Sequence, residues 1–198
     1  MSGIKQTMAD DAKAFKNYQL KKTVVLVGMM GAGKTAVGRA LAARLNVPFL
    51  DSDAEIEAAA NLSVPEIFQR DGEPFFRKRE AEVIARLLQQ ECMILSTGGG
   101  AFLTAANRDM ITQHGVSVWL NADLALLWQR VRHKDSRPLL RTADPFGTLS
   151  ELYHARVPIY KKANITVPCQ PNLSIDGMAK RVIEALCTRV DVLEARDA

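Results

Sequence analysis

Short apolar runs alternate with longer amphipathic segments along most of this chain. Apolar runs rich in β-branched residues predict buried strands, and apolar positions at helical spacing predict helices. Strands are expected at residues 23–27, 48–53, 93–96, 116–120 and 164–168. Helices are expected at residues 34–45, 53–60, 75–90, 104–113, 122–131, 148–162 and 174–190, with a further one opened by the capping-box spacing at 63–66. Strands separated by helices predict an α/β fold with a parallel sheet, and ligands bind at the carboxyl ends of such strands.

Residues 132–147 interrupt this periodicity. The segment is polar, contains two prolines and lies between two predicted helices. A connection of this length in a compact domain is typically a functional lid or a disordered loop, and we expect a mobile lid here. The polar residues 1–22 form an expected N-terminal extension, mobile or a short surface helix. The predicted organisation is therefore a single domain at 23–190, with 191–198 as a C-terminal tail.

The turn between the first strand and the first helix carries the strongest chemical signal. Residues 28–35, "GMMGAGKT", fit G-x-x-x-x-G-K-[ST], the P-loop pattern. Its glycines let backbone N–H groups point inward at the positive end of a helix, where they hold phosphate oxygens. Lys34 is expected to reach the β- and γ-phosphates, and the Thr35 hydroxyl to bind Mg²⁺. The alternative, a chance glycine-rich turn, is disfavoured by the strand and helix on either side. The predicted nucleotide-binding residues of the loop are Gly31, Ala32, Gly33, Lys34, Thr35 and Ala36.

Two acids follow the second predicted strand, in "DSD" at 51–53. Acids two apart on an extended chain project the same way, so one of them can serve the Mg²⁺ and the other a substrate hydroxyl. The third predicted strand, "MILS", ends without the usual acid of a second P-loop motif, and Asp51 is therefore our candidate for the metal. The alternative is that Ser52 or Asp53 only caps the next helix.

Two further groups are candidates for contact with an acceptor. Arg77 lies near the start of a predicted helix, where a positive charge is destabilised by the helix dipole. An anionic substrate bound by Arg77 would offset that electrostatic cost. Glu80, three residues on, shares the face of Arg77 and can orient the guanidinium. The alternative is a solvated charged face with an internal ion pair. The triplet 98–100 of glycines follows a buried strand and indicates a close backbone approach or unusual dihedrals, or else a tight turn.

Arginines in and around the predicted lid suit phosphoryl transfer. Arg137 is the candidate to close over the transferring group, because an arginine there stabilises the developing charge. Arg130 and Arg132 stand at the entry of the lid, and Arg130 can stack on a base or contact phosphate. Arg156 precedes a Val-Pro step that is expected to disturb its helix. For each of these arginines the alternative is an ordinary solvated side chain.

Composition narrows the class of protein. The chain has 198 residues, a net charge of +4 and 6% aromatic residues, without a long basic run, which argues against nucleic acid as the main partner. No apolar run has the length of a membrane span, and no secretory or transit signal is evident. The three cysteines have no metal-like spacing and are expected to be reduced thiols in a cytoplasmic protein.

Taken together, "GMMGAGKT", "DSD", "DGEPFFRKRE", "TGGGAF", "RPLL" and "RVPIY" resemble the motifs of the shikimate kinase family in order and spacing, over about 23–190. The resemblance implies the fold of the nucleoside monophosphate kinases, a three-layer sandwich whose five-stranded parallel sheet has the order 2-3-1-4-5. It also implies transfer of a phosphoryl group from ATP, with Mg²⁺, to the 3-hydroxyl of shikimate in aromatic amino acid biosynthesis. The protein is then expected to be a monomeric cytoplasmic enzyme.

The same resemblance assigns roles to residues. Asp53 and Arg77 are expected to bind shikimate, with Arg156, and Asp53 to face the reacting hydroxyl. Mg²⁺ is expected beside Thr35 and Asp51, Arg137 on the phosphates and Arg130 beside adenine. The acceptor pocket is expected to be lined by Gly98, Gly99 and Gly100. Catalysis is assigned to Lys34, Asp53 and Arg137. The segment "CQPNLSID" lacks the arginines that some members carry there.

Two other functions fit some of these residues. A kinase of the same architecture that acts on gluconate or on a nucleotide would share the P-loop, and gluconate also offers a carboxylate to the arginines. A nucleotide-binding switch without an acceptor would need neither the lid arginine nor the paired acids, and would present an exposed apolar patch. The paired acids and the lid arginine favour the kinase.

Overall fold

The computed structural model describes residues 18–133 and 138–195. Strands and helices alternate along most of these residues, and five of the seven strands are those that the hydrophobic pattern predicts. The strands are β1 (Tyr18–Leu20), β2 (Thr23–Val27), β3 (Phe49–Asp51), β4 (Ile94–Ser96), β5 (Gly115–Asn121), β6 (Ile165–Pro168) and β7 (Leu193–Ala195). The α-helices are α2 (Lys34–Leu45), α3 (Ser52–Ala60), α4 (Val64–Leu88), α5 (Ala105–His114), α6 (Leu124–Val131), α7 (Pro145–Tyr160) and α8 (Ile175–Leu186), with short 3-10 turns η1 (Ala101–Leu103) and η2 (Pro138–Leu140).

Five strands form one parallel sheet in the order β3-β4-β2-β5-β6. Numbered along the chain from β2, this is the predicted order 2-3-1-4-5, so the topology is confirmed. The central strand β2 is buried along its whole length between β4 and β5. A strand with neighbours on both sides and helices on both faces has no polar face, which is why "TVVLV" is a continuous apolar run.

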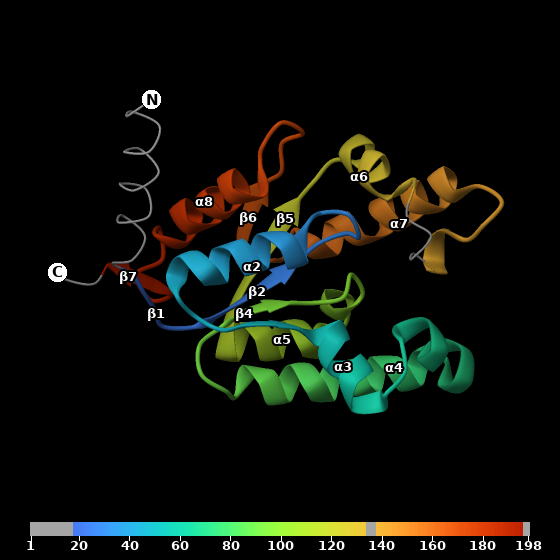
Figure 1. Ribbon diagram of the computed structural model, residues 1–198, viewed down its shortest axis with the longest axis horizontal. Helices are drawn as coiled ribbons and strands as arrows, with labels where there is room; N and C mark the ends of the chain where they lie inside the picture. Colours follow the sequence, from blue (N-terminus) through green and yellow to red (C-terminus); the bar gives the residue numbers. More distant parts are fainter. Residues whose placement is uncertain (1–17, 134–137, 196–198) are drawn as a thin grey trace, which may run out of the picture.

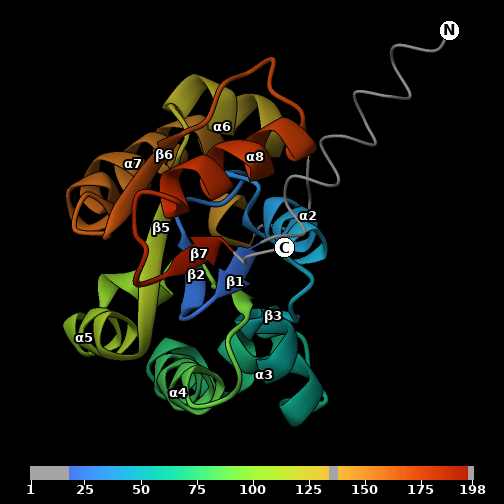
Figure 2. The ribbon, with the colours of Figure 1, turned by 90° about the vertical axis from the view of Figure 1, so that its left-hand side faces the viewer.

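Helices cover both faces of the sheet. Seen along its edge, α2 lies on one side and α5 and α7 on the other (Figure 2). The helix α8 packs beside α2, where Arg44 pairs with Asp176 at the start of α8. All five strands of the sheet point the same way, and the turn from β2 to α2 lies at their carboxyl ends (Figure 1). Residues that follow different strands are therefore brought together at one edge.

A second, two-stranded sheet was not predicted. β1 pairs antiparallel with β7, with Gln19 opposite Glu194. The pair lies at the end of the molecule away from the carboxyl ends of the main strands (Figure 1). Leu20 and Leu193 are buried against the main core. The expected extension at 1–22 and the expected tail at 191–198 are thus in contact through these strands.

Two helices differ from their predicted bounds for identifiable reasons. The segments expected from Ser63 and at 75–90 are joined in α4, with the predicted capping box of Ser63 and Glu66 at its start and a non-helical residue, Gly72 (φ 82°, ψ 167°), at the junction. The helix expected from residue 148 begins at Pro145, because the Asp144 side chain caps it by accepting from the Gly147 N–H. The same helix continues through Pro158 to Tyr160 instead of breaking there.

Candidate active site

The P-loop curls around the start of α2. Gly33 is the residue before the helix and has φ 95°, and no side chain caps the first N–H groups of the helix. Gly28 has φ 138°, and a Cβ there would lie 2.9 Å from the Leu120 carbonyl oxygen, so both positions require glycine. The Lys34 ammonium donates to the carbonyl oxygens of Gly28 (2.8 Å) and Met29 (3.1 Å). An amine held at the open end of a helix, beside uncapped N–H groups, is a site for phosphate.

Asp51, at the end of β3, joins the P-loop to the next helix. Its side chain accepts from the Thr35 hydroxyl (2.9 Å) and from the Asp53 N–H (3.1 Å). The cap of α3 is therefore Asp51 rather than Ser52 or Asp53, which corrects the alternative considered for this motif. Ser96, at the end of β4, lies 3.4 Å from the Thr35 hydroxyl. Two or three hard oxygens beside a phosphate site suit Mg²⁺, which is usually held by a few protein oxygens together with phosphates and water.

The triple glycine is required by its neighbours rather than by its dihedrals. None of the three residues has a positive φ. A Cβ at Gly98 would lie 2.7 Å from an Asp53 carboxylate oxygen and 2.9 Å from one of Glu80, and a Cβ at Gly100 would lie 2.4 Å from the Arg77 guanidinium. The close approach is therefore observed, and it is made by charged side chains. The alternative, a tight turn, is present as well, because the Ala101 N–H donates to the Gly98 carbonyl oxygen (3.2 Å).

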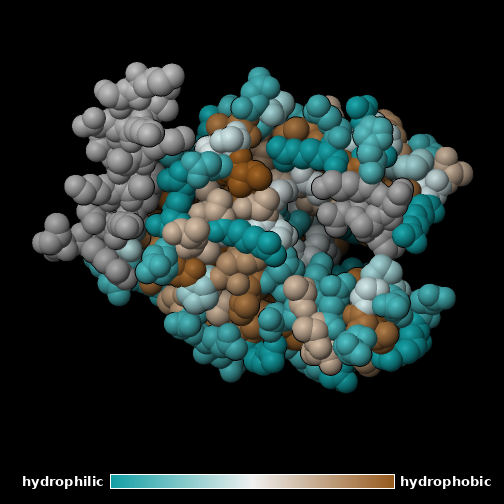
Figure 3. Space-filling model, in the orientation of Figure 1, coloured by the Kyte–Doolittle hydropathy of each residue, from teal (hydrophilic) through white to brown (hydrophobic). Residues whose placement is uncertain are grey.

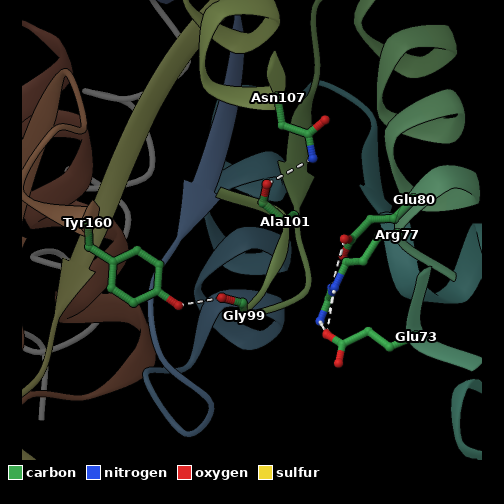
Figure 4. A network of polar contacts seen from close by, with 7 residues as sticks. All are labelled: Glu73, Arg77, Glu80, Gly99, Ala101, Asn107 and Tyr160. Carbon is green, nitrogen blue, oxygen red and sulfur yellow. Dashed lines mark hydrogen bonds and ion pairs between the residues drawn. The ribbon is translucent and has the colours of Figure 1, made fainter. Parts of the chain in front are cut away.

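Arg77 is held between two carboxylates on its own helix. It donates to Glu80 (2.8 Å) and to Glu73 (3.0 and 3.1 Å) (Figure 4). Glu80 has no exposed surface, and burial raises the pKa of its carboxyl while Arg77 opposes that rise. The guanidinium also lies over the Phe76 ring, 5.2 Å from its centroid. The internal ion pair considered as an alternative exists, and it fixes the guanidinium so that it also lines a cavity.

Asp53 lies where several charges meet. Burial is the largest cause of a rise in its pKa to about 6; nearby Asp51 raises it further, and Lys34 and Arg77 lower it. Its Oδ1 atom is buried without a hydrogen-bond partner, as is the Oε1 atom of Glu80. A carboxylate oxygen left without a donor in a cavity is suited to accept a hydrogen bond from a bound hydroxyl group.

Arg156 is buried, at 9% exposure, and is not the ordinary surface side chain considered as its alternative. It comes from α7, whereas Arg77 comes from α4, yet both line one cavity together with Gly98, Gly99 and Gly100. A Cβ at Gly99 would lie 3.5 Å from the Arg156 guanidinium. Two guanidiniums from different helices that line one cavity are suited to bind a carboxylate.

Two adjoining cavities make up the site. One, of about 470 Å³, is lined by the P-loop with Asp51, Ser96 and Arg130. The other, of about 350 Å³, is lined by Arg77, Glu80 and Arg156. Four residues line both: Met30, Asp53, Gly98 and Gly99. In the space-filling view the surface is hollowed at this edge, between the parts of the molecule built by α4 and by α7 (Figure 3).

Of the arginines predicted in and beside the lid, Arg130 and Arg132 are among the residues that the structure describes. Arg130, at the end of α6, donates to the carbonyl oxygens of Gly31 (3.2 Å) and Ala32 (3.3 Å) and lines the P-loop cavity. Its contact with a nucleotide stays a prediction. Arg132 is exposed. Arg137 lies outside the described residues. Beyond it, Leu139 and Arg141 line the second cavity and were not predicted.

Other contributors were also missed from the sequence. Met30 and the aromatic wall of Phe68 and Phe76 line the second cavity, and Gln170, Ser174 and Met178 line the first. Tyr160 was also missed; its hydroxyl donates to the Gly99 carbonyl oxygen. The signal available for it was its spacing, because it follows Arg156 by four residues and so shares its helix face. Loop residues such as Gln170 carry no periodicity from which to place them.

Three general features complete the description. In the parts of the chain that the structure describes, no group of three or more His, Cys, Asp or Glu side chains is placed to hold a metal ion. Within the same residues no helix is both long and apolar enough to span a bilayer. Cys92, Cys169 and Cys187 are free thiols.

Comparison with known proteins bears on the identity of this site. The family model for shikimate kinase matches residues 30–187. A shikimate kinase from Ruegeria pomeroyi is 70% identical over 88% of this chain and 90% of its own length, and one from Cereibacter sphaeroides is 62% identical over 89% of this chain and 88% of its own. A solved shikimate kinase from Acinetobacter baumannii, in complex with shikimate, is 37% identical, with a TM-score of 0.81 over 89% of this chain and 97% of its own. A P-loop cavity adjoining an arginine-lined cavity, in a chain this similar throughout, leads to one conclusion: the chain belongs to the shikimate kinase family.

Proposed function

We propose that the two cavities bind ATP and shikimate, and that Asp53 lies at the point of transfer between them. The enzymes of this family phosphorylate shikimate with ATP, in aromatic amino acid biosynthesis, and use Mg²⁺. The observation that carries the assignment of residues is the junction itself: Asp53, Gly98 and Gly99 line both the P-loop cavity and the cavity with the paired arginines.

On the donor side, the loop residues Gly31 to Ala36 surround the triphosphate with backbone N–H groups. Lys34 exchanges its carbonyl partners for phosphate oxygens when ATP is bound. Thr35 and Asp51 supply the protein oxygens for Mg²⁺, whose chemical contribution is to neutralise charge on the phosphates. Arg130 lies on the nucleotide side of this cavity, and Arg137 is the proposed lid arginine.

On the acceptor side, Arg77 and Arg156 bind the carboxylate of shikimate. A clamp with charge on two sides fixes both the position and the orientation of the ring, so that one hydroxyl faces the donor cavity. The backbone of the three glycines lines the same pocket, since side chains there would displace the charged groups. Asp53 accepts a hydrogen bond from the 3-hydroxyl.

The chemistry needs little covalent help from the protein. A γ-phosphoryl group passes in line to a hydroxyl oxygen through a loose transition state, so positioning and charge stabilisation dominate. Asp53, with a pKa of about 6, is ionised at neutral pH. Its carboxylate can therefore accept a hydrogen bond from the attacking hydroxyl while the O–P bond forms. Closure of the lid excludes water, which would otherwise take the phosphoryl group.

A panel of acceptors in a coupled ADP-release assay tests this proposal. Shikimate is expected to be phosphorylated far faster than gluconate or a nucleoside monophosphate; the reverse order would refute the assignment. Arg77→Ala is expected to raise the shikimate KM about a hundredfold or more, the effect of losing one partner of a buried charge contact. Arg79→Ala is the matched control, because Arg79 lies two residues along the same helix, exposed and paired with Glu82.

Three wider assignments belong to the same proposal. The kinase domain spans 23–190, with the lid at about 132–147, the extension at 1–22 and the tail at 191–198. The enzyme is proposed to act as a monomer. It works in the cytoplasm, which agrees with three cysteines in thiol form. Gel filtration with light scattering measures the mass in solution and so tests whether the enzyme is a monomer.

A further inference from the structure

Tyr160 is a buried polar residue that the proposed chemistry does not use. It ends α7 and has no exposed surface. Its ring stacks on Trp119 of β5, with centroids 6.1 Å apart and planes 25° apart. Its hydroxyl donates a hydrogen bond to the Gly99 carbonyl oxygen (Figure 4). A phenylalanine would fill the same space without burying a hydroxyl, so packing alone does not account for this tyrosine.

The hydroxyl and Arg156 converge on the same glycine. A Cβ at Gly99 would lie 3.5 Å from an Arg156 nitrogen and 3.7 Å from the Tyr160 oxygen. Tyr160 and Arg156 lie four residues apart on one helix face, as i and i+4 neighbours do. Burial raises the pKa of Tyr160 to about 12, and the charge of nearby Arg156 opposes that rise. The hydroxyl and the Arg156 guanidinium therefore both lie beside Gly99, the residue to which the hydroxyl donates.

The stacked pair also reaches the P-loop. A Cβ at Gly28 would lie 3.3 Å from the Trp119 ring, so this ring packs directly under the first residue of the loop. The Gly28 carbonyl oxygen in turn accepts from Lys34 and lies 3.7 Å from the Cβ position at Gly99. Tyr160 thus stands where α7, the glycine turn and the P-loop meet.

We infer that the Tyr160 hydroxyl is a positioning group for acceptor binding: it fixes the Gly99 peptide and the Arg156 guanidinium relative to one another. The inference rests on the proposed function, since it assigns the acceptor to the cavity that Arg156 lines. Tyr160 lines neither of the two cavities and acts through these two partners. Its contribution belongs to the orientation of the acceptor rather than to the transfer step.

Tyr160→Phe tests the inference, because it removes the oxygen and keeps the stacked ring. We expect the shikimate KM to rise about tenfold, the factor that corresponds to one net hydrogen bond of ~1.4 kcal/mol. The kcat and the ATP KM are expected to stay within about threefold, and the melting temperature within a few degrees. Tyr153→Phe, at a half-buried tyrosine on the same helix away from both cavities, is the matched control and should change none of these values.

A double-mutant cycle separates the possible outcomes. If Tyr160 acts through Arg156, then Tyr160→Phe adds little to the KM in an Arg156→Ala background. A full tenfold effect in that background, or an unchanged shikimate KM in the single variant, overturns the inference. So does an equal rise in both KM values with a lower melting temperature, the signature of a structural role. If Arg156→Ala itself leaves the shikimate KM unchanged, the proposed acceptor pocket fails instead.

Trp119→Phe covers the case in which the tyrosine variant does not fold. It weakens the stacking and leaves the Tyr160 hydroxyl in place. We expect a lower melting temperature and a shikimate KM within about threefold of the parent enzyme. A tenfold rise in that KM would show that ring packing, and not the hydroxyl, sets acceptor binding, and would contradict the inference.

Discussion

Gly100→Ala isolates the contact between the glycine turn and the Arg77 guanidinium. The new Cβ would lie 2.4 Å from both terminal nitrogens of Arg77 and 2.5 Å from its central carbon. Ordinary contact of a Cβ atom begins at 3.4 Å. The guanidinium must therefore retreat by about 1 Å, and misplacements of this size at an active site can cost about a hundredfold in rate.

The backbone itself accepts the alanine. Gly100 has φ −91° and ψ −20°, a right-handed conformation open to any residue. Alanine at such a position restricts the unfolded chain and adds about 0.4–1 kcal/mol of stability, which offsets part of the cost of weakening the contact of Arg77 with buried Glu80. We therefore expect a melting temperature within a few degrees of the parent, together with a large loss of activity.

Steady-state kinetics against each substrate measures the effect. The expected result is a fall of about a hundredfold in kcat/KM for shikimate, mostly through KM, with the ATP KM unchanged. The same substitution in an Arg77→Ala background should have little further effect, since the displaced group is then absent. A Gly100→Ala enzyme with the parent's shikimate KM would refute the idea that these glycines exist to make room for charged side chains.

Three other changes probe different parts of the molecule. Lys34→Met should keep the circular dichroism spectrum and abolish turnover; a near-normal kcat would contradict the P-loop assignment. For Asp53, the pKa is raised from 3.8 to about 6, so the folded state binds the proton more tightly than the unfolded one, and stability falls as pH rises through that window. Asp53→Asn should remove this dependence and stabilise the fold at pH 7 by up to about 3 kcal/mol in chemical denaturation, and an unchanged midpoint would argue against the raised pKa. The parent's kcat/KM for shikimate should also decline below about pH 6, as the Asp53 carboxylate is protonated. Leu193→Ala, at a residue 2% exposed in β7, should cost about 2–5 kcal/mol of unfolding free energy; no loss in urea denaturation would mean that this strand is not part of the folded domain.

Local chemistry explains why much of the site could be predicted. The P-loop is a contiguous segment whose function depends on its own backbone, so Gly28 to Thr35 could be identified without tertiary information. The acids of "DSD" and the triple glycine each follow a buried strand, and a parallel sheet places all strand ends at one edge. Predicting that edge was therefore enough to bring Asp51, Asp53 and the glycines together.

Other features depended on contacts between segments far apart in the chain. The pairing of β1 with β7 joins two short, unremarkable stretches near the ends, and nothing in either stretch specifies its partner. Leu139 and Arg141 line the cavity that also contains Arg77 and Arg156. Their place there depends on how η2 packs against the rest of the domain. The raised pKa of Asp53 likewise comes from burial and from charges on other elements.

The sequence by itself determined the order of the strands and helices, the phosphate cradle and the list of charged groups at the strand ends, because apolar periodicity and glycine backbone preferences act over a few residues. Only the tertiary structure decided that Arg77 of α4 and Arg156 of α7 face one cavity, and that Asp53 lies between that cavity and the P-loop. The physical reason is that the packing of helices on the sheet sets these distances. The burial of a side chain and the electrostatic potential at it depend on all its neighbours in space, and the order of residues along the chain does not specify those neighbours.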